Sequence, residues 1–240
     1  MNVTEKIQKS IDRLPEGITF KYRQLRINPD EFIAAAKAIE RLIAKNQIKR
    51  ISTGTFYKPK KTPFGELMPP EEELLKPYLF SQKKRIAYVT GTSLYNRLGL
   101  TTQVPKTIKI ASRDKRITIT TGSLQAKPVK SYVDVSNNNY YLLELLDVLK
   151  DFIKIPDLDK QSAIRYLLNR LKKFTTKERN DLIKIAMKYP PRSRAFLGAL
   201  LQEIKSKQNV KPLKHSLNPL TEYNLGIKSD LSKAANWSIK

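Results

Sequence analysis

The sequence contains no cysteine and a single histidine, His215. Without cysteine, the chain has no disulfides, no thiolate zinc site and no cysteine nucleophile. No apolar run reaches the roughly 18 residues of a membrane-spanning helix, and the first residues, MNVTEKIQKS, lack the apolar segment of a secretory signal. These absences predict a cytoplasmic protein with no membrane segment, no catalytic site, no metal and no cofactor.

Phosphate-binding and nucleophile motifs are also missing. The best candidate is YVTGTSLYNRLGLTTQVPKTIKI, residues 88–110, in which Gly91, Thr92 and Ser93 begin a short helix. A P-loop requires GxxxxGK[ST], a dinucleotide loop GxGxxG and a nucleophile elbow GxSxG, and none of these patterns is present. We therefore expect a strand, turn and helix that only pack together, with Thr90 capping the helix and Gly99 ending it.

Acidic residues are scarce relative to basic ones. The chain carries 46 Lys and Arg against 22 Asp and Glu, a formal net charge of +24. The excess is spread along the whole chain instead of forming a detachable basic tail. This distribution favours a polyanionic partner, although a solvated lysine-rich surface would give the same count.

The first sixty residues predict a compact series of elements. Amphipathic spacing indicates a helix over 3–13, and alternation indicates a strand over 18–22. One helical turn follows over 22–26, then a longer helix over 29–45 and a β-hairpin over 47–58. This order is that of a winged helix-turn-helix, in which the longer helix enters the major groove and the hairpin is the wing.

The longer helix has two different faces. Asn28 and Glu31 form the pattern of a capping box at its start. Phe32, Ala36, Ile39 and Ile43 are expected on the buried face, and a stripe of basic residues on the other face. The residues predicted to contact DNA are Tyr22, Arg23, Arg26, Lys37, Arg41, Lys45, Lys49, Arg50, Thr53, Lys58, Lys60 and Lys61.

The rest of the chain predicts an α+β domain. A proline- and glycine-rich linker is expected from residue 62 to about 70, followed by a helix that begins at Glu71–Glu73. Short strands are expected near 85–89, 106–112, 116–122 and 129–135, and helices from residue 137 onward. The predicted domains are a winged helix-turn-helix over 1–61, a domain with a small β-sheet and a helical bundle over 62–227, and a polar tail over 228–240.

Four segments together resemble the AbiEi-like antitoxins of bacterial type IV toxin–antitoxin, or abortive infection, systems. They are RLPEGITFKY with AIERLIAKNQIKRISTGTFYKPK, then YVTGTSLYNRLGLTTQVP, KYPPRSRAFLGALL and LNPLTEYNLGI. The first is generic to winged helices, whereas the second is specific. In this family an arginine is common just before the wing glycine, and here Thr53 takes that place.

The resemblance implies a transcriptional repressor that binds double-stranded DNA at its own operator, at inverted repeats, and a C-terminal domain that acts in phage defence. That domain would counter a nucleotidyltransferase-like toxin without forming a stable complex with it. From the residues themselves, Arg192 and Arg194 are candidates for the antitoxin surface, because they place positive charge at the start of a helix against its dipole.

Two alternatives remain open from the sequence. One is a stand-alone winged-helix regulator whose C-terminal domain senses a ligand or dimerises. The other is an enzyme that acts on nucleic acid, for which Asp134 with Glu144 or Asp147 are the best carboxylate candidates.

Overall fold

The computed structural model describes residues 2–121 and 124–240 and shows a mixed α+β protein. The last residue of the strand expected over 116–122 therefore lies outside the described residues. The chain divides into two compact units. Unit 1 comprises Met1–Lys83 with Ile119–Gln125, and unit 2 comprises Lys84–Thr118 with Ala126–Lys240.

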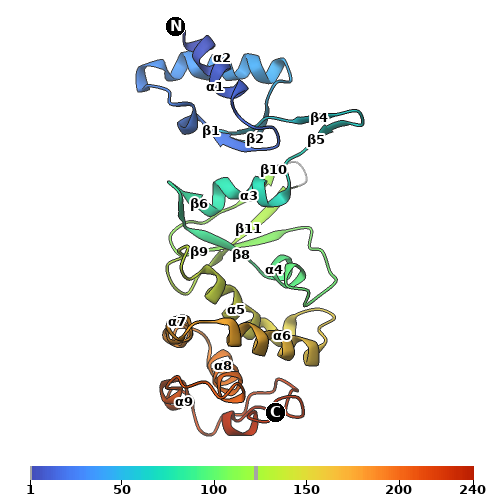
Figure 1. The fold of residues 1–240 in the computed structure, drawn as a ribbon, viewed down its shortest axis with the longest axis vertical. Coiled ribbons are helices and arrows are strands. Elements are labelled where there is room, and N and C mark those ends of the chain that lie inside the picture. The colour runs from blue at the N-terminus through green and yellow to red at the C-terminus, as the bar shows by residue number, and fades with distance from the viewer. Residues whose placement is uncertain (1, 122–123) are drawn as a thin grey trace. The chain divides into compact units, whose positions relative to one another are not determined.

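Over its described residues, unit 1 contains three α-helices and a three-stranded antiparallel sheet of order β1-β3-β2 (Figure 1). Up to residue 83 its elements are α1 (Val3–Asp12), β1 (Thr19–Lys21), the 3-10 turns Tyr22–Leu25 and Pro29–Glu31, α2 (Phe32–Ala44), β2 (Lys49–Ser52), β3 (Thr55–Tyr57), β4 (Lys60–Thr62), β5 (Gly65–Leu67), α3 (Glu71–Leu79) and β6 (Phe80–Ser81). Ile7 and Ile11 from α1, Ile39 from α2, and Phe20 and Phe56 from the sheet form its buried core.

The expected linker after residue 61 is instead ordered structure that belongs to unit 1. Residues 60–67 form the β4–β5 hairpin, and α3 packs against β1. The Thr19 hydroxyl donates to the Glu73 carbonyl oxygen at 3.1 Å, and Lys21 Nζ donates to the Pro77 carbonyl oxygen at 2.8 Å. The boundary therefore lies after Lys83, because composition alone does not reveal that these residues bond to the sheet.

Unit 2 combines a mixed sheet with a group of helices. Its strands are β8, β9 and residues 126–130 of β11, whereas β10 falls in the range 119–125 of unit 1. In this sheet β8 and β9 are antiparallel, and β9 and β11 are parallel. The remaining elements are β7 (Lys84–Arg85), β8 (Ala87–Thr90), α4 (Thr92–Arg97), β9 (Ile108–Ser112), β10 (Ile119–Thr121), β11 (Leu124–Lys130), α5 (Tyr140–Asp151), the 3-10 turn Phe152–Lys154, α6 (Lys160–Lys173), α7 (Thr176–Ala186), α8 (Pro191–Glu203), α9 (Lys211–His215) and the 3-10 turn Ala235–Trp237. The strand expected over 129–135 lies earlier in the chain, as β11 at Leu124–Lys130. Its position was missed because β11 contains Pro128, which is opposite Ile110 of β9, and proline within a segment argues against a strand.

The strand–turn–helix prediction for residues 88–99 is confirmed, with one correction. Gly91 precedes α4 with φ 69° and ψ −153°, a conformation that is essentially restricted to glycine. Thr90 does not cap the helix. Its hydroxyl donates instead to the carboxylate of Asp147 at 2.6 Å.

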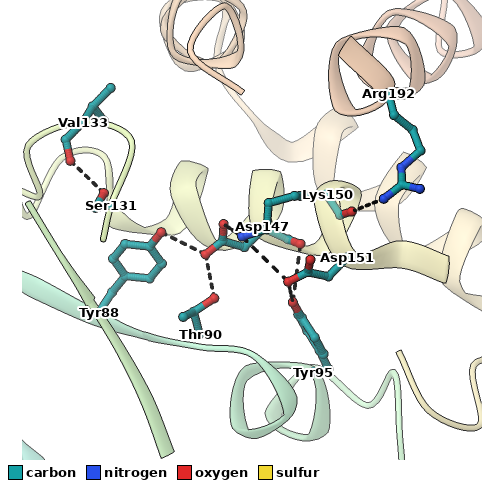
Figure 2. A network of polar contacts seen from close by, with 9 residues as sticks. All are labelled: Tyr88, Thr90, Tyr95, Ser131, Val133, Asp147, Lys150, Asp151 and Arg192. Atoms are coloured by element: carbon teal, nitrogen blue, oxygen red, sulfur yellow. Dashed lines mark hydrogen bonds and ion pairs between the residues drawn. The ribbon is translucent and has the colours of Figure 1, made fainter. Parts of the chain in front are cut away.

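Asp147 is the centre of a buried polar network that joins the sheet to α5 (Figure 2). It also accepts a hydrogen bond from the Tyr88 hydroxyl at 2.9 Å and pairs with Lys150 Nζ at 2.9 Å. One turn further along α5, Asp151 accepts a hydrogen bond from the Tyr95 hydroxyl at 2.8 Å. Burial raises the pKa of both tyrosines, so each hydroxyl keeps its proton and remains a donor.

The predicted polar tail, 228–240, is a folded part of unit 2. Leu231, Trp237 and Ile239 are buried in its core. The backbone also pairs here, since Tyr223 N donates to the Ser238 carbonyl oxygen and Lys240 N donates to the Tyr223 carbonyl oxygen. The Trp237 ring lies on Gly198 of α8, where an added Cβ would stand only 2.1 Å from the ring.

We predict that Gly198→Ala destabilises the protein by about 1–3 kcal/mol through overpacking. This reverses the effect expected in an ordinary helix, where alanine is favoured over glycine by about 1 kcal/mol. In a Trp237→Leu background the same change should cost much less, because the ring no longer occupies the space. Chemical denaturation measures both effects, and a stabilising Gly198→Ala would contradict the docking of the C-terminal segment.

We also predict that Asp147→Asn lowers the free energy of unfolding by about 2 kcal/mol, because it leaves Lys150 without its nearest counter-ion in a largely buried position. Asp181→Asn is the matched control. Asp181 also faces a lysine three residues later, Lys184 at 4.0 Å, but both side chains are well exposed. That control should change stability by less than about 0.5 kcal/mol, and equal effects would contradict the structural role of Asp147.

Candidate nucleic-acid interface

The start of α2 is fixed by contacts with α1. The backbone N–H of Asn28 donates to the Glu31 carboxylate at 3.2 Å, which confirms this contact of the expected capping pair. Lys6 Nζ of α1 donates to the same carboxylate at 2.9 Å, and this hydrogen bond lowers the pKa of Glu31. The Glu31 carboxylate at the start of the helix is therefore already engaged.

The buried face of α2 is rotated slightly from the one expected. Ala35, Ala38, Ile39 and Leu42 are buried, so of the four predicted residues only Ile39 is fully buried. Small alanines fit where α2 approaches α1 and the sheet. As a result, Ile33 is 74% exposed on the opposite side.

That opposite side carries the predicted basic stripe. Lys37, Arg41 and Lys45 are all exposed, at intervals of four residues. Among the described residues, no acidic side chain forms an ion pair with any of the three. Ile33 extends the stripe by one turn toward the start of the helix, so this face combines cations with one apolar side chain.

The expected wing hairpin is formed by β2 and β3 around Thr53 and Gly54, and Gly54 has φ 71°. Thr53 is exposed at this turn. Arg50 is exposed as well, and its guanidinium lies 5.7 Å from the centre of the Phe56 ring. The turn thus presents one arginine and short polar side chains.

Tyr22 lies between α2 and this hairpin and is only partly exposed. Its ring contacts Phe32 and Phe56, with centroid distances of 5.1 and 5.2 Å. Burial raises the pKa of Tyr22, and the positive charge of Arg50 offsets only some of that shift. Its ring therefore holds α2 against the hairpin, and its hydroxyl stays protonated.

Two of the predicted DNA contacts are engaged within the protein. Lys49 pairs with Glu66, and this hydrogen bond raises the pKa of Lys49. Lys58 Nζ donates to the carbonyl oxygens of Asp12 and Leu14, each at 3.3 Å, at the end of α1. Both lysines therefore stabilise contacts within unit 1, and either would have to leave these partners to bind a phosphate.

The other predicted cations of unit 1 are exposed. Arg23 lies in the 3-10 turn before α2, and Arg26 ends that turn with φ 51°. Lys60 and Lys61 lie on β4, outside the three-stranded sheet. The candidate interface therefore consists of Arg23, Arg26, Ile33, Lys37, Arg41, Lys45, Arg50, Thr53, Lys60 and Lys61.

The proposed antitoxin pair in unit 2 is not a free cationic surface. Arg192 donates to the Lys150 carbonyl oxygen at 3.1 Å, near the C-terminal end of α5 (Figure 2). Arg194 is partly buried, and its Nε has no hydrogen-bond partner among the described residues. The positive charge of Arg192 at the start of α8 is thus offset at the end of α5, where carbonyl groups attract a cation.

Of the carboxylates considered for a nuclease, Asp134 is exposed, whereas Glu144 and Asp147 are buried. Asp147 is held in the network described above, and Glu144 pairs with Arg97 at 2.7 Å. Burial raises the pKa of Glu144, and the charge of Arg97 opposes that rise. In the described stretches of the chain no group of three His, Cys, Asp or Glu side chains is placed to hold a metal ion.

Sequence reasoning missed two features of unit 1. Ile33 was an available signal, since it is an apolar residue outside the amphipathic pattern of its helix. The β4–β5 hairpin was concealed by Pro63 and Gly65, which indicate a linker as readily as a turn. No helix in the described residues is long and apolar enough to cross a membrane.

Comparisons with known proteins show one family match and a similar solved structure. Residues 6–122 match DUF6088, a family of unknown function, and no curated protein sequence matches the chain. The structure is similar to the crystal structure of the RV2827C protein from Mycobacterium tuberculosis, with a TM-score of 0.56 at 11% identity. The match covers 93% of this chain and 85% of that one, and at this identity it shows a shared fold alone.

Proposed function

We propose that unit 1 binds double-stranded DNA as a winged helix, with α2 in the major groove. The observation that carries the proposal is the exposed stripe of Lys37, Arg41 and Lys45, which has no acidic partner among the described residues and is fixed on a helix whose other face is buried. The succession of α1, β1, a 3-10 turn, α2, β2 and β3, with the sheet order β1-β3-β2, supports it. It matches the order of elements in winged helices.

The parts of the interface have distinct tasks in this proposal. Lys37, Arg41 and Lys45 contact phosphates or base edges along the groove, and Arg50 beside the β2–β3 turn contacts the flanking backbone. Ile33 lies where it can contact thymine methyl groups, an apolar form of base readout. The net charge of +24 adds long-range attraction to DNA.

The full proposed role is that of a cytoplasmic type IV antitoxin that represses its own operon. Support for the antitoxin role comes from the resemblance of segments 88–105, 188–201 and 217–227 to AbiEi-like antitoxins. In this role the chain carries no catalytic site and acts on a nucleotidyltransferase-like toxin without a stable complex. A stand-alone regulator is the alternative, and it would lack a toxin gene next to its own.

The DNA-binding proposal predicts that Lys37→Ala with Arg41→Ala weakens binding to the DNA upstream of the gene by about tenfold. Each lost phosphate contact should reduce the slope of log K against log salt by about 0.9. Lys184→Ala with Lys188→Ala is the matched control, since it also removes two exposed cations four residues apart. If both double variants bind DNA with the affinity and slope of the wild type, α2 is not the contact surface.

The antitoxin proposal predicts that the same Lys37→Ala, Arg41→Ala variant still protects cells. Expressed from an unrelated promoter, the full-length variant should rescue growth against the neighbouring toxin as well as the wild type does. Protection by the wild type but not by this variant would place antitoxin activity on the DNA-binding face. Failure of the wild type to protect would favour the stand-alone regulator.

A further inference from the structure

The β4–β5 hairpin is a projecting element with no side packed on a core. Its strands pair in register, Lys60 with Leu67 and Thr62 with Gly65, around the two-residue turn Pro63–Phe64. The Thr62 hydroxyl closes the turn by donating to the Gly65 carbonyl oxygen at 2.7 Å. Figure 1 shows the hairpin extending away from the three-stranded sheet of unit 1.

The hairpin and the residue after it expose three large apolar side chains. The Phe64 side chain at the turn is fully exposed, and Leu67 and Met68 are more than half exposed. An exposed apolar tip of this kind favours aggregation unless a binding partner covers it. It therefore indicates an occupant that covers the Phe64 ring.

The charges of the hairpin indicate which occupant that is. Glu66 is the one acidic residue between 58 and 68, and it is paired with Lys49 of β2, which also anchors the hairpin. Lys60 and Lys61 remain exposed beside the apolar tip. Lysine is depleted at protein–protein interfaces, whereas a lysine-flanked apolar wedge is typical of proteins that insert into the minor groove of DNA.

We infer that the β4–β5 hairpin is a minor-groove arm that bends the DNA bound by unit 1. Lys60 and Lys61 neutralise phosphates on the two sides of the groove, and Pro63 and Phe64 enter between neighbouring base pairs. The stiff proline and the flat ring separate the two base pairs of a single step, and the resulting kink brings the flanking duplex toward the protein. This inference rests on the proposed DNA-binding function, and it assigns the arm a separate role from that of α2.

Fluorescence energy transfer between the two ends of a short duplex tests the arm. The probe is the upstream duplex used for the salt titration, labelled with a donor and an acceptor. Wild-type protein should raise the transfer efficiency, as expected for a kink of about 20–90°. Phe64→Ser should still bind, with an affinity reduced by about tenfold or less, but should leave the duplex straight at saturation.

Leu220→Ser is the matched control, because Leu220 is a similarly exposed apolar side chain in unit 2. This variant should bend DNA as the wild type does. If the wild type binds without bending DNA, or if Phe64→Ser bends it equally, the hairpin is not a DNA-bending arm. The proposed role of α2 would not be affected by either result. Dimerisation of the free protein that Phe64→Ser abolishes in sedimentation would also overturn it, since a second copy would then cover the tip. Absence of any wild-type binding would instead refute the proposed function itself.

Discussion

The candidate interface depends on the burial of one face of α2. Ala35, Ala38, Ile39 and Leu42 pack against α1 and the sheet, so the helix cannot rotate without exposing its core residues. The opposite face must then meet solvent or a partner, and it carries Lys37 and Arg41 without acidic counterparts among the described residues. An exposed, rigidly held row of cations is well suited to a polyanion, because little backbone freedom remains to be lost on binding.

Neighbouring contacts determine which cations are available to DNA. Glu66 pairs with Lys49, and backbone carbonyls hold Lys58, so some of the basic residues around the sheet are used for folding. In unit 2, Lys150 and Arg192 are likewise engaged by Asp147 and by the end of α5. The net charge therefore overstates the free cationic surface, and position on α2 matters more than the number of lysines.

Periodicity and capping patterns predicted the elements of unit 1 well, because α2 and the β2–β3 hairpin are defined by local sequence. They placed the stripe of Lys37, Arg41 and Lys45 correctly but put Phe32, which is half exposed, on the buried face. A shift of one residue is within the tolerance of an amphipathic pattern. The β4–β5 hairpin was missed although it is local, whereas the other missed features depend on contacts distant in sequence. Thr90 bonds Asp147, α3 bonds β1, and Trp237 packs on Gly198, and no local pattern reveals such pairs.

The most direct test of the account is to map the DNA-binding surface of the intact protein by backbone amide NMR during titration with the upstream duplex. The account predicts that the largest shift changes fall on residues 33–45 and on the β2–β3 turn, and that they weaken with added salt. Changes concentrated in unit 2, with α2 unaffected, would contradict it.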